Sequence, residues 1–533
     1  MRAYTSWILR RKEGLAVASI LLLAGIARFY ALDFGLPYLR HPDESKTILH
    51  ALRFWSGDLN PHFFIWPAFN FYMVSGLYGL LYLFGLLRGT FHSTSDLLVS
   101  FSSGPTPFYL MGRILAASLG TATVGLVYLL GKRAYSAATG LIGALFMAFA
   151  PLHVEESHYA LLDVPCTFFI LLSSIFILSV LIKGRRQDYL LAGFLAGLAT
   201  AVKYNALFLI LPFILAQFQG SWSRGKSAKG MFLDTNIYLG LASMALGFFL
   251  GSPYTILDWR HSWLELAMLS SRVSSGTHLG FEDIGSGWIY HLTVNLRDGL
   301  GLSLLVVALL GVCYASYRHK DVDKVLVSFP LVYYAIIGSS RVVFPRYVLP
   351  LLPFLLLLGA EVVVEGTSRF LRGSARSYAL TGISLALVAM PAFRVTIEDY
   401  ALTLHDTRTT AYEWVEANIP KGARLLVGDY GPPRLEANYE VFHLSAFGLV
   451  NEPNDLGYDI EEVRERGIEY VIISSLVYER HLNSPDYYPG EVAFYSALEQ
   501  EVTLIYEISP QEIDWVIVKH PSPGPTIKIY RIE

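Results

Sequence analysis

The sequence predicts a polytopic α-helical membrane protein with a small α/β domain at its C-terminus. Of its 533 residues, 53% are hydrophobic and only 16% are charged, whereas soluble domains carry about 25% charged residues. Apolar runs long enough to cross a bilayer recur as far as residue 393. Beyond that point the apolar runs shorten and charged residues become more frequent. We therefore expect a membrane domain over residues 1–393 and a second domain over residues 394–533.

The first apolar run, near residues 15–34, predicts the orientation of the chain. It is long enough to span the membrane and too long for the apolar region of a signal peptide, so we interpret it as an uncleaved anchor. Arg10, Arg11 and Lys12 precede it, and basic residues favour the cytoplasmic side. The segment that follows, 41-HPDE-44, is then expected at the outer face of the plasma membrane.

The basic loops predict the number of spans. Four later clusters of lysine and arginine are all cytoplasmic only if one of the apolar runs at 66–87 and 108–131 fails to cross. These clusters are Lys183/Arg185/Arg186, Arg224/Lys226/Lys229, Arg318/Lys320/Lys324 and Arg369/Arg372/Arg376. We therefore assign residues 66–87 to a re-entrant or surface-lying segment and expect about 11 spans. The N-terminus is then cytoplasmic and the C-terminal domain extracytoplasmic.

Residues 394–533 alternate between helical and strand patterns. Helices are expected at 409–418, 459–467 and 491–500, and strands at 423–429, 469–475, 502–509 and 526–532. Such alternation predicts a small α/β domain with a largely parallel sheet. No Gly-rich phosphate-binding motif opens any of these helices, which argues against nucleotide binding. The net charge of −3 and the lack of a basic arm argue against a nucleic-acid partner.

Ionisable residues gather at the ends of predicted spans on the outer face. They are Asp43, Glu44, Asp163, Lys203, Arg341 and Arg346. Each has a structural alternative, because an aspartate can cap a helix, a lysine can extend along the apolar surface, and an arginine can anchor a span at the interface. Together, carboxylates and cations at one face suit a reaction in which a hydroxyl loses a proton while a membrane-held phosphate leaves.

A metal site is a further alternative for part of this region. His153, Glu155, Glu156 and His158 lie close together in the sequence, but their spacing matches no familiar ligand motif. We therefore name no metal ligand, and we leave a divalent metal ion open as a cofactor.

Several of these segments resemble a known family in sequence and in order. They are 41-HPDE-44, 59-LNPHFFIWPAFNFY-72, 112-GRILAASLGTATVGLVYLLGKRAY-135 and 158-HYALLDVP-165. Over about residues 10–350 the chain resembles the GT-C glycosyltransferases, most nearly the protein O-mannosyltransferase-like and aminoarabinose-transferase-like membrane enzymes. The resemblance implies a cell-envelope enzyme that moves a sugar from a polyprenyl-phosphate donor to a hydroxyl, usually with inversion. The acceptor, whether protein, lipid or glycan, is left open.

The resemblance also implies roles for individual residues. Asp43 is the expected general base, with Glu44 beside it and Asp163 as the acidic residue of the second outer loop. Lys203, Arg346 and Arg341 are expected to bind the donor phosphate. The expected substrate contacts are His62, His158, Tyr159 and Tyr347.

Two other classes of protein remain as alternatives to an enzyme. A polytopic transporter or flippase would move a lipid-linked or polar substrate, but transporters tend to show internal repeats and ionisable residues near the membrane midplane. The sequence shows neither feature. The other alternative is a structural subunit whose outer domain binds a partner.

Overall fold

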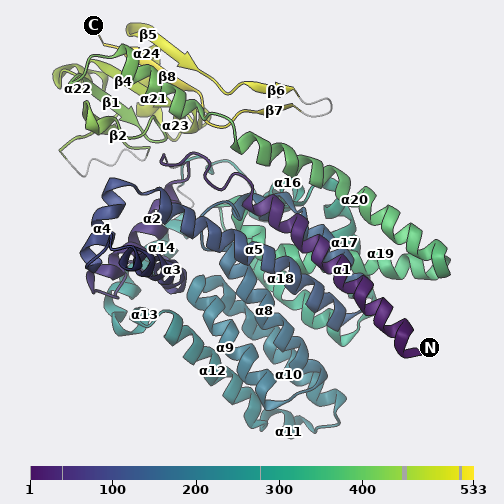
Figure 1. The fold of residues 1–533 in the computed structure, drawn as a ribbon. Helices are drawn as coiled ribbons and strands as arrows, with labels where there is room; N and C mark the ends of the chain where they lie inside the picture. The colour runs from purple at the N-terminus through teal and green to yellow at the C-terminus, as the bar shows by residue number, and fades with distance from the viewer. Residues whose placement is uncertain (1, 39, 276–277, 447–452, 515–518, 533) are drawn as a thin grey trace. The chain divides into compact units, whose positions relative to one another are not determined.

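The computed structural model describes residues 2–38, 40–275, 278–446, 453–514 and 519–532 (Figure 1). Contacts divide the chain into two compact units. The helical unit comprises Met1–Leu32, Asp43–Ser271 and Ser286–Thr396. The sheet unit comprises Asp33–Pro42, Arg272–Gly285 and Ile397–Glu533. Two short stretches from the first 393 residues therefore belong to the second unit, which the sequence did not predict.

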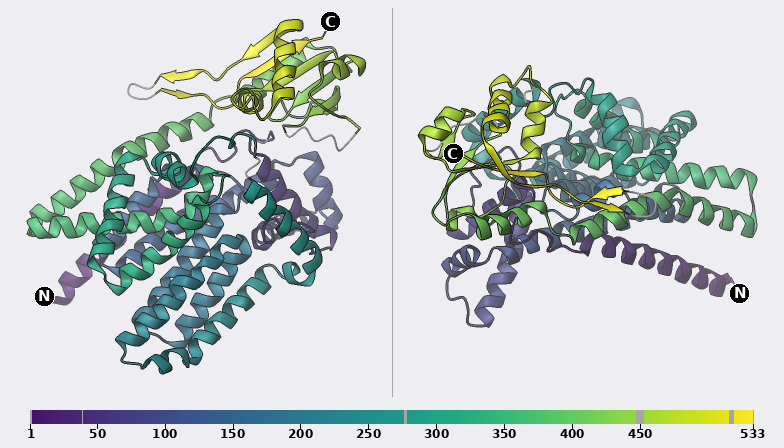
Figure 2. Two further views of the ribbon diagram at one scale, coloured as in Figure 1. Left: turned by 180° about the vertical axis from the view of Figure 1, so that it is seen from behind. Right: turned by 90° about the horizontal axis from the view of Figure 1, so that it is seen from above.

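The helical unit is a bundle of long, mostly apolar helices (Figures 1 and 2). Its main helices are α1 (Arg2–Phe29), α2 (Pro42–Arg53), α3 (Phe69–Leu87), α4 (Thr94–Ser103), α5 (Thr106–Ala134), α6 (Ala137–Ala148), α7 (Pro151–Glu156), α8 (Asp163–Ile182), α9 (Arg186–Val202), α10 (Ile210–Ser223), α12 (Thr235–Gly251), α14 (Trp259–Ser275), α17 (Leu302–Arg318), α18 (Asp321–Gly338), α19 (Leu352–Phe370) and α20 (Gly373–Leu402). A 3-10 helix, η4 (Pro345–Leu351), leads into α19. Helices α5, α6, α8, α9 and α19 supply much of the large apolar core of this unit.

Seven helices in the described part of the chain are long and apolar enough to cross a membrane, or eight if one bent pair counts as a single span. They are Phe69–Leu87, Thr106–Ala134, Asp163–Ile182, Tyr204–Ser223, Ala228–Gly251, Pro345–Phe370 and Gly373–Asn418, and the bent pair is Gly287–Leu300 with Leu302–Arg318. The multi-pass helical architecture is confirmed. The count of about 11 stays a prediction, because α6 and α9 coincide with predicted spans but have only 12 and 17 residues.

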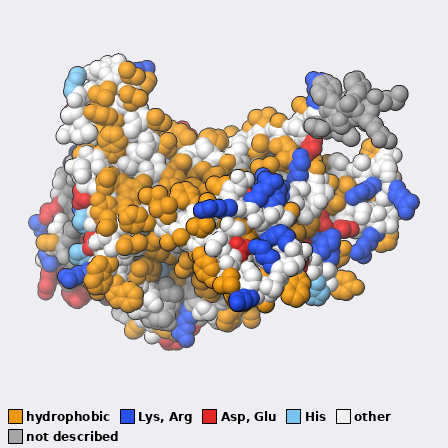
Figure 3. Space-filling view, turned by 90° about the horizontal axis from the view of Figure 1, so that it is seen from below, with side chains coloured by type: hydrophobic (Ala, Val, Ile, Leu, Met, Phe, Trp, Pro, Cys, Tyr) orange, Lys and Arg blue, Asp and Glu red, His pale blue; other side chains and the backbone are white. Residues whose placement is uncertain are grey.

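Residues 66–87 were expected to re-enter the membrane or lie on its surface, and residues 69–87 of this segment form the continuous helix α3. This helix leaves Leu80, Leu83, Phe84 and Leu87 exposed. A broken, re-entrant shape is not observed, and both a crossing helix and a surface-lying helix fit this segment. Seen from below, apolar side chains cover much of the surface and lysines and arginines gather in one half of the view (Figure 3). Apolar surface of this extent is typical of a protein that contacts lipid.

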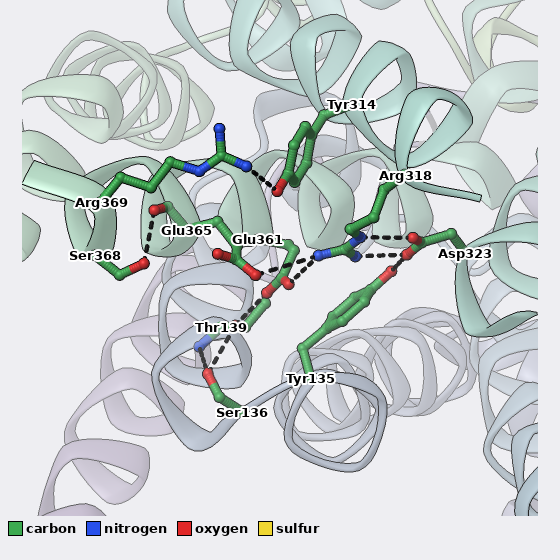
Figure 4. Close-up of polar contacts among 10 residues, drawn as sticks. All are labelled: Tyr135, Ser136, Thr139, Tyr314, Arg318, Asp323, Glu361, Glu365, Ser368 and Arg369. Carbon is green, nitrogen blue, oxygen red and sulfur yellow. Dashed lines mark hydrogen bonds and ion pairs between the residues drawn. The ribbon is translucent and has the colours of Figure 1, made fainter. Parts of the chain in front are cut away.

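A buried ionic network ties the ends of several helices in the helical unit together (Figure 4). Arg318, at the end of α17, donates two hydrogen bonds of 2.7 Å to Asp323 of α18 and one of 2.7 Å to Glu361 of α19. Tyr135, after α5, donates to Asp323 at 2.6 Å, and Thr139 of α6 donates to Glu361 at 2.9 Å. We call these five residues the Arg318 network. It neutralises carboxylates that would otherwise be isolated in an apolar bundle.

The sheet unit contains a six-stranded sheet in the order β3-β2-β1-β4-β8-β5. The strands are β1 (Arg424–Gly428), β2 (Glu440–Leu444), β3 (Asp455–Leu456), β4 (Tyr470–Ser474), β5 (Thr503–Ile508) and β8 (Ile527–Arg531). Strands β1 to β4 are parallel, whereas β8 runs antiparallel to both β4 and β5. Helices α21 (Thr407–Asn418), α22 (Ile460–Glu465), α23 (Ser475–Leu482) and α24 (Pro489–Glu501) complete the unit. The four predicted strands correspond to β1, β4, β5 and β8, whereas β2 and β3 were not predicted, and the sheet is mixed rather than largely parallel because β8 is antiparallel to both of its neighbours.

Candidate active site

Asp43 lies between two cations in the first turn of α2. Proline at the first helical position needs no N–H partner, and carboxylates are favoured near a helix N-terminus. Both features start α2 at Pro42 and place Asp43 beside η4. Arg346 Nη2 donates to Asp43 Oδ2 at 3.1 Å, and Lys46 Nζ donates to Asp43 Oδ1 at 2.8 Å. The Asp43 side chain keeps 13% of its surface exposed.

Glu44 faces an entirely different environment from Asp43. Its two carboxylate oxygens accept hydrogen bonds of 2.8 Å each from Nε and Nη2 of Arg113 on α5. The backbone N–H of Ala160 donates a third, at 3.0 Å. Both side chains of the Glu44–Arg113 pair are 0% exposed. Glu44 therefore fixes α2 against α5 and the loop before α8, and it has no exposed surface to offer a substrate.

Asp163 and Lys203 form the second ion pair of the site. Asp163 is the first residue of α8, and Leu162, not Asp163, occupies the N-cap position. The expectation that Asp163 caps the helix is therefore not met. Lys203, directly after α9, instead donates from Nζ to Asp163 Oδ1 at 2.6 Å. The same Nζ lies 5.1 Å from the centre of the Tyr347 ring, an arrangement that further stabilises the ammonium charge.

Glu156, the last residue of α7, interacts electrostatically with Asp163, Lys203 and Arg346, although the sequence analysis assigned it no role in the proposed chemistry. Its Oε2 is shielded from solvent and has no hydrogen-bond partner among the described residues. Burial raises the pKa of the Glu156 carboxyl to about 8; Asp163 adds to this effect, and Arg346 and Lys203 oppose it.

Several predicted residues lie apart from these ion pairs. Arg341 is exposed, and no ion pair or hydrogen bond joins it to the cluster in the described part of the chain. His62 is exposed and contacts Asp58 at 2.8 Å. His158 is buried with its two ring nitrogens 2.9 Å and 3.1 Å from the backbone oxygens of Val154 and Tyr30. Burial lowers the pKa of His158 to about 4, and its two backbone hydrogen bonds oppose this effect. Of the predicted substrate contacts, Tyr347 lies against Lys203.

The four residues considered for a metal site do not form one in the structure. His153 Nδ1 lies 3.0 Å from Arg28 Nη2 and accepts its hydrogen bond, and His158 faces backbone oxygens. Glu155 is exposed, whereas Glu156 belongs to the cluster with Asp163. Within the described ranges, no group of three or more His, Cys, Asp or Glu side chains could hold a metal ion.

Four segments that are distant in the sequence therefore meet in the helical unit. They contribute Asp43 from α2, Glu156 and Asp163 from α7 and α8, Lys203 after α9, and Arg346 and Tyr347 from η4. We call these six residues the carboxylate–cation cluster. It combines a partly exposed carboxylate that can accept a proton with two cations that can bind an anion.

Comparisons with known proteins agree with the resemblance seen in the sequence. The family model described as dolichyl-phosphate-mannose-protein mannosyltransferase matches residues 109–256, which include Arg113, Glu156, Asp163 and Lys203. No curated protein sequence matches the chain.

Solved structures with the same fold cover almost the whole chain. The oligosaccharyltransferase AglB from Archaeoglobus fulgidus, in complex with an inhibitory peptide and a dolichol-phosphate, is 12% identical with a TM-score of 0.54, covering 97% of this chain and 77% of that chain. ArnT from Cupriavidus metallidurans in the apo state is 14% identical with a TM-score of 0.53, covering 99% of this chain and 98% of that chain. ArnT bound to undecaprenyl phosphate is 13% identical with a TM-score of 0.53, covering 98% of both chains. The resemblance to the GT-C glycosyltransferases is thereby confirmed at the level of the fold.

Proposed function

We propose that the protein is a membrane glycosyltransferase that moves a sugar from a polyprenyl-phosphate donor to an acceptor hydroxyl. The observation that carries this proposal is the carboxylate–cation cluster, in which Asp43 and Asp163 pair with Arg346 and Lys203. The solved structures with this fold include ArnT bound to undecaprenyl phosphate and AglB with a dolichol-phosphate. A lipid phosphate is thus a ligand of proteins that share the fold, and the cluster offers the cations to bind one.

The chemistry assigns Asp43 as the general base. A hydroxyl is a weak nucleophile until a neighbouring group accepts its proton, and a carboxylate within hydrogen-bond reach can do so. The acceptor oxygen then bonds to the anomeric carbon while the bond from that carbon to the phosphate oxygen breaks. Lys203 and Arg346 offset the negative charge that develops on the leaving phosphate.

Substitution of Asp43 by asparagine tests this role. Asp43→Asn keeps the size of the side chain and removes the base, so turnover of a polyprenyl-phosphate sugar should fall by about 10²–10⁴-fold. Asp58→Asn is the matched control. Asp58, like Asp43, precedes α3 in the chain, but its side chain is exposed. Near-normal turnover of Asp43→Asn at saturating substrates would assign the base elsewhere, with Asp163 as the next candidate.

The proposal includes a location for the reaction. We assign the cluster to the outer face of the plasma membrane, the N-terminus to the cytoplasm and the sheet unit to the extracytoplasmic side. The four basic clusters support this orientation, although Arg318 is engaged in the Arg318 network and contributes little free charge to its loop. Membrane lipid surrounds the helical unit in this proposal. Whether the acceptor is a protein, a lipid or a glycan is to be determined by experiment. A divalent metal requirement is tested by turnover before and after chelation.

The same assay separates the enzyme from a transporter or flippase. An enzyme consumes a labelled polyprenyl-phosphate sugar and releases the lipid phosphate, whereas a flippase relocates the intact donor between leaflets. Asp163 and Lys203 lie at helix ends, which suits surface chemistry better than passage through the midplane.

A further inference from the structure

A π-helical turn lies in the segment that packs against η4. The segment runs from the short helix α15 (Gly287–Tyr290) through the π-helical η3 (His291–Leu296) to α16 (Arg297–Leu300). Helix η3 contacts η4, which carries Arg346 and Tyr347 of the carboxylate–cation cluster. π-helical turns are rare and occur frequently at functional sites, so their presence beside η4 indicates a role in the candidate site.

Two buried polar side chains of η3 are joined to each other and to the chain that precedes η4. Asn295 is 3% exposed and His291 is 0% exposed. The amide nitrogen of Asn295, Nδ2, donates to the backbone oxygen of Val343 at 2.8 Å and lies 2.8 Å from Nδ1 of His291. A carbonyl oxygen can only accept a hydrogen bond, so the nitrogen of the amide must face Val343. Nδ1 of His291 therefore accepts the second N–H of Asn295.

The chain between α18 and η4 depends on such contacts because residues 340–344 form no helix or strand. Buried backbone groups in an irregular stretch must find partners outside regular secondary structure. Val343 is 0% exposed, and Asn295 supplies the partner of its backbone oxygen. Gly287 also approaches this stretch closely, since a Cβ atom there would lie 2.5 Å from the backbone oxygen of Ser340. Helices α15 and η3 therefore hold the chain in place just before η4.

Phe344 connects this anchored stretch to Arg346. It follows Val343 directly in the chain, and Cζ of Arg346 lies 4.6 Å from the centre of the Phe344 ring. The ring of Tyr347 meets the Phe344 ring edge to face, with the centres 5.6 Å apart, and the backbone N–H of Tyr347 donates to the backbone oxygen of Phe344 at 3.0 Å. A displacement of Val343 therefore moves the ring against which the guanidinium of Arg346 is placed.

We propose that Asn295 and His291 are positioning residues, which hold Val343 so that Arg346 is placed to bind the phosphate of the lipid-linked donor. This inference rests on the proposed function and extends it to residues outside the carboxylate–cation cluster. A long side chain such as arginine loses conformational freedom when it binds a ligand. Because the chain beside Arg346 is ordered before the donor arrives, less freedom is lost on binding.

Three substitutions test the hydrogen bonds of η3. Asn295→Leu keeps the approximate size of the side chain and removes the donor to Val343. His291→Leu removes the acceptor that orients the Asn295 amide, whereas His291→Asn keeps an acceptor near the position of Nδ1. Gln217→Leu is the matched control, because Gln217 is also a fully buried amide, and on α10 it donates to the backbone oxygen of Met231 at 3.1 Å.

The first measurement is the affinity of each purified variant for polyprenyl phosphate, made together with its unfolding temperature. Asn295→Leu and His291→Leu should each weaken the affinity by about tenfold, since a misplacement of about 1 Å in a binding site can cost up to about a hundredfold. His291→Asn should bind nearly as tightly as the wild-type protein. Gln217→Leu should bind as tightly as the wild-type protein even though its unfolding temperature falls.

A double-mutant cycle with Arg346→Met distinguishes positioning from a general loss of structure. If Asn295 acts through Arg346, Asn295→Leu should weaken phosphate binding much less in the Arg346→Met background than in the wild-type background. General destabilisation would weaken binding equally in both backgrounds. If Asn295→Leu does not fold, the same cycle is run with His291→Leu, and His291→Asn is the conservative variant that should restore binding.

The outcomes that contradict the inference differ from those that contradict the proposed function. Wild-type affinity in both leucine variants of η3, equal losses in the two backgrounds, or equal affinities of His291→Leu and His291→Asn would each overturn the positioning role. Normal phosphate binding by Arg346→Met would overturn both that role and the assignment of Arg346 as a phosphate ligand. If the expected binding pattern appears but a polyprenyl-phosphate sugar is not turned over, the transferase proposal fails and the positioning role remains.

Discussion

Removal of the charge of Glu44 should destabilise the helical unit far more than it impairs the chemistry. In the structure, Glu44 and Arg113 are both fully buried and joined by two hydrogen bonds of 2.8 Å, with a third from Ala160. Glu44→Gln leaves the guanidinium of Arg113 buried without a counter-charge. Breaking a buried pair in this way costs about 3–5 kcal/mol. We therefore expect a clear fall in the unfolding temperature of the purified protein.

Replacement of both partners sharpens the test. The double variant Glu44→Leu, Arg113→Met removes both charges, so it should be more stable than the single variant Glu44→Gln, because no isolated charge remains. The control is Glu461→Gln on α22, whose ion pair with Arg464 is exposed and should contribute only about 0–1 kcal/mol.

The assay is thermal unfolding of each variant in lipid nanodiscs, followed by turnover measured well below the unfolding temperature. If Glu44→Gln unfolds at the wild-type temperature yet loses as much turnover as Asp43→Asn, the structural role assigned to Glu44 is wrong. The two adjacent carboxylates would then share the chemistry.

Three further predictions address phosphate binding, orientation and assembly. Arg346→Lys keeps the charge but loses the planar pair of donors, so affinity for polyprenyl phosphate should fall about tenfold to a hundredfold; unchanged binding would make Arg346 an interface anchor. Ser223→Cys should react with a membrane-impermeant thiol reagent only in permeabilised cells, and labelling of intact cells would reverse the predicted orientation. Arg318→Met leaves Asp323 and Glu361 without their cation and should cost about 3–5 kcal/mol, measured as a lower unfolding temperature. Arg372→Met, in the loop that follows α19, should have little effect.

The sequence could predict which residues approach one side of the membrane domain, but not how they pair. Span ends that face the same side follow from the order of apolar runs and basic loops, and this is why Asp43, Asp163, Lys203 and Arg346 were selected together. Their partners depend on how the helices rotate and pack, which no spacing in a single sequence specifies. The ion pairs of Asp43 with Arg346 and of Asp163 with Lys203 are therefore structural findings.

Glu44 and Glu156 show the limits of the pattern more clearly. Neighbouring residues on a helix point about 100° apart, so Glu44 and Asp43 reach different surroundings. A single arginine, Arg113, within the apolar run 108–131 was the available signal for the partner of Glu44. Glu156 had no comparable signal, because no spacing in the sequence predicts that α7 packs against η4.

The sheet unit departs from prediction for a simpler reason. A parallel connection between neighbouring strands needs a crossover of a dozen or more residues, usually a helix. No helix was expected between the strands at 502–509 and 526–532, and β5 and β8 are antiparallel. The absence of an expected helix between these two strands therefore indicated an antiparallel pair. The alternation of helices and strands in the rest of the domain suggested a parallel sheet instead.

The Arg318 network also constrains how the protein is made. Arg318 and Asp323 lie on either side of the short turn between α17 and α18, so they meet as soon as that hairpin leaves the ribosome and enters the bilayer. Glu361 is synthesised later, within the apolar segment Pro345–Phe370, and a lone carboxylate there opposes release from the translocon into lipid. Arg318, already in place, offers it a partner. Synthesis from the N-terminus thus places Arg318 in the membrane before Glu361. We expect α19 to be retained beside the α17–α18 hairpin until Arg318 and Glu361 are in contact.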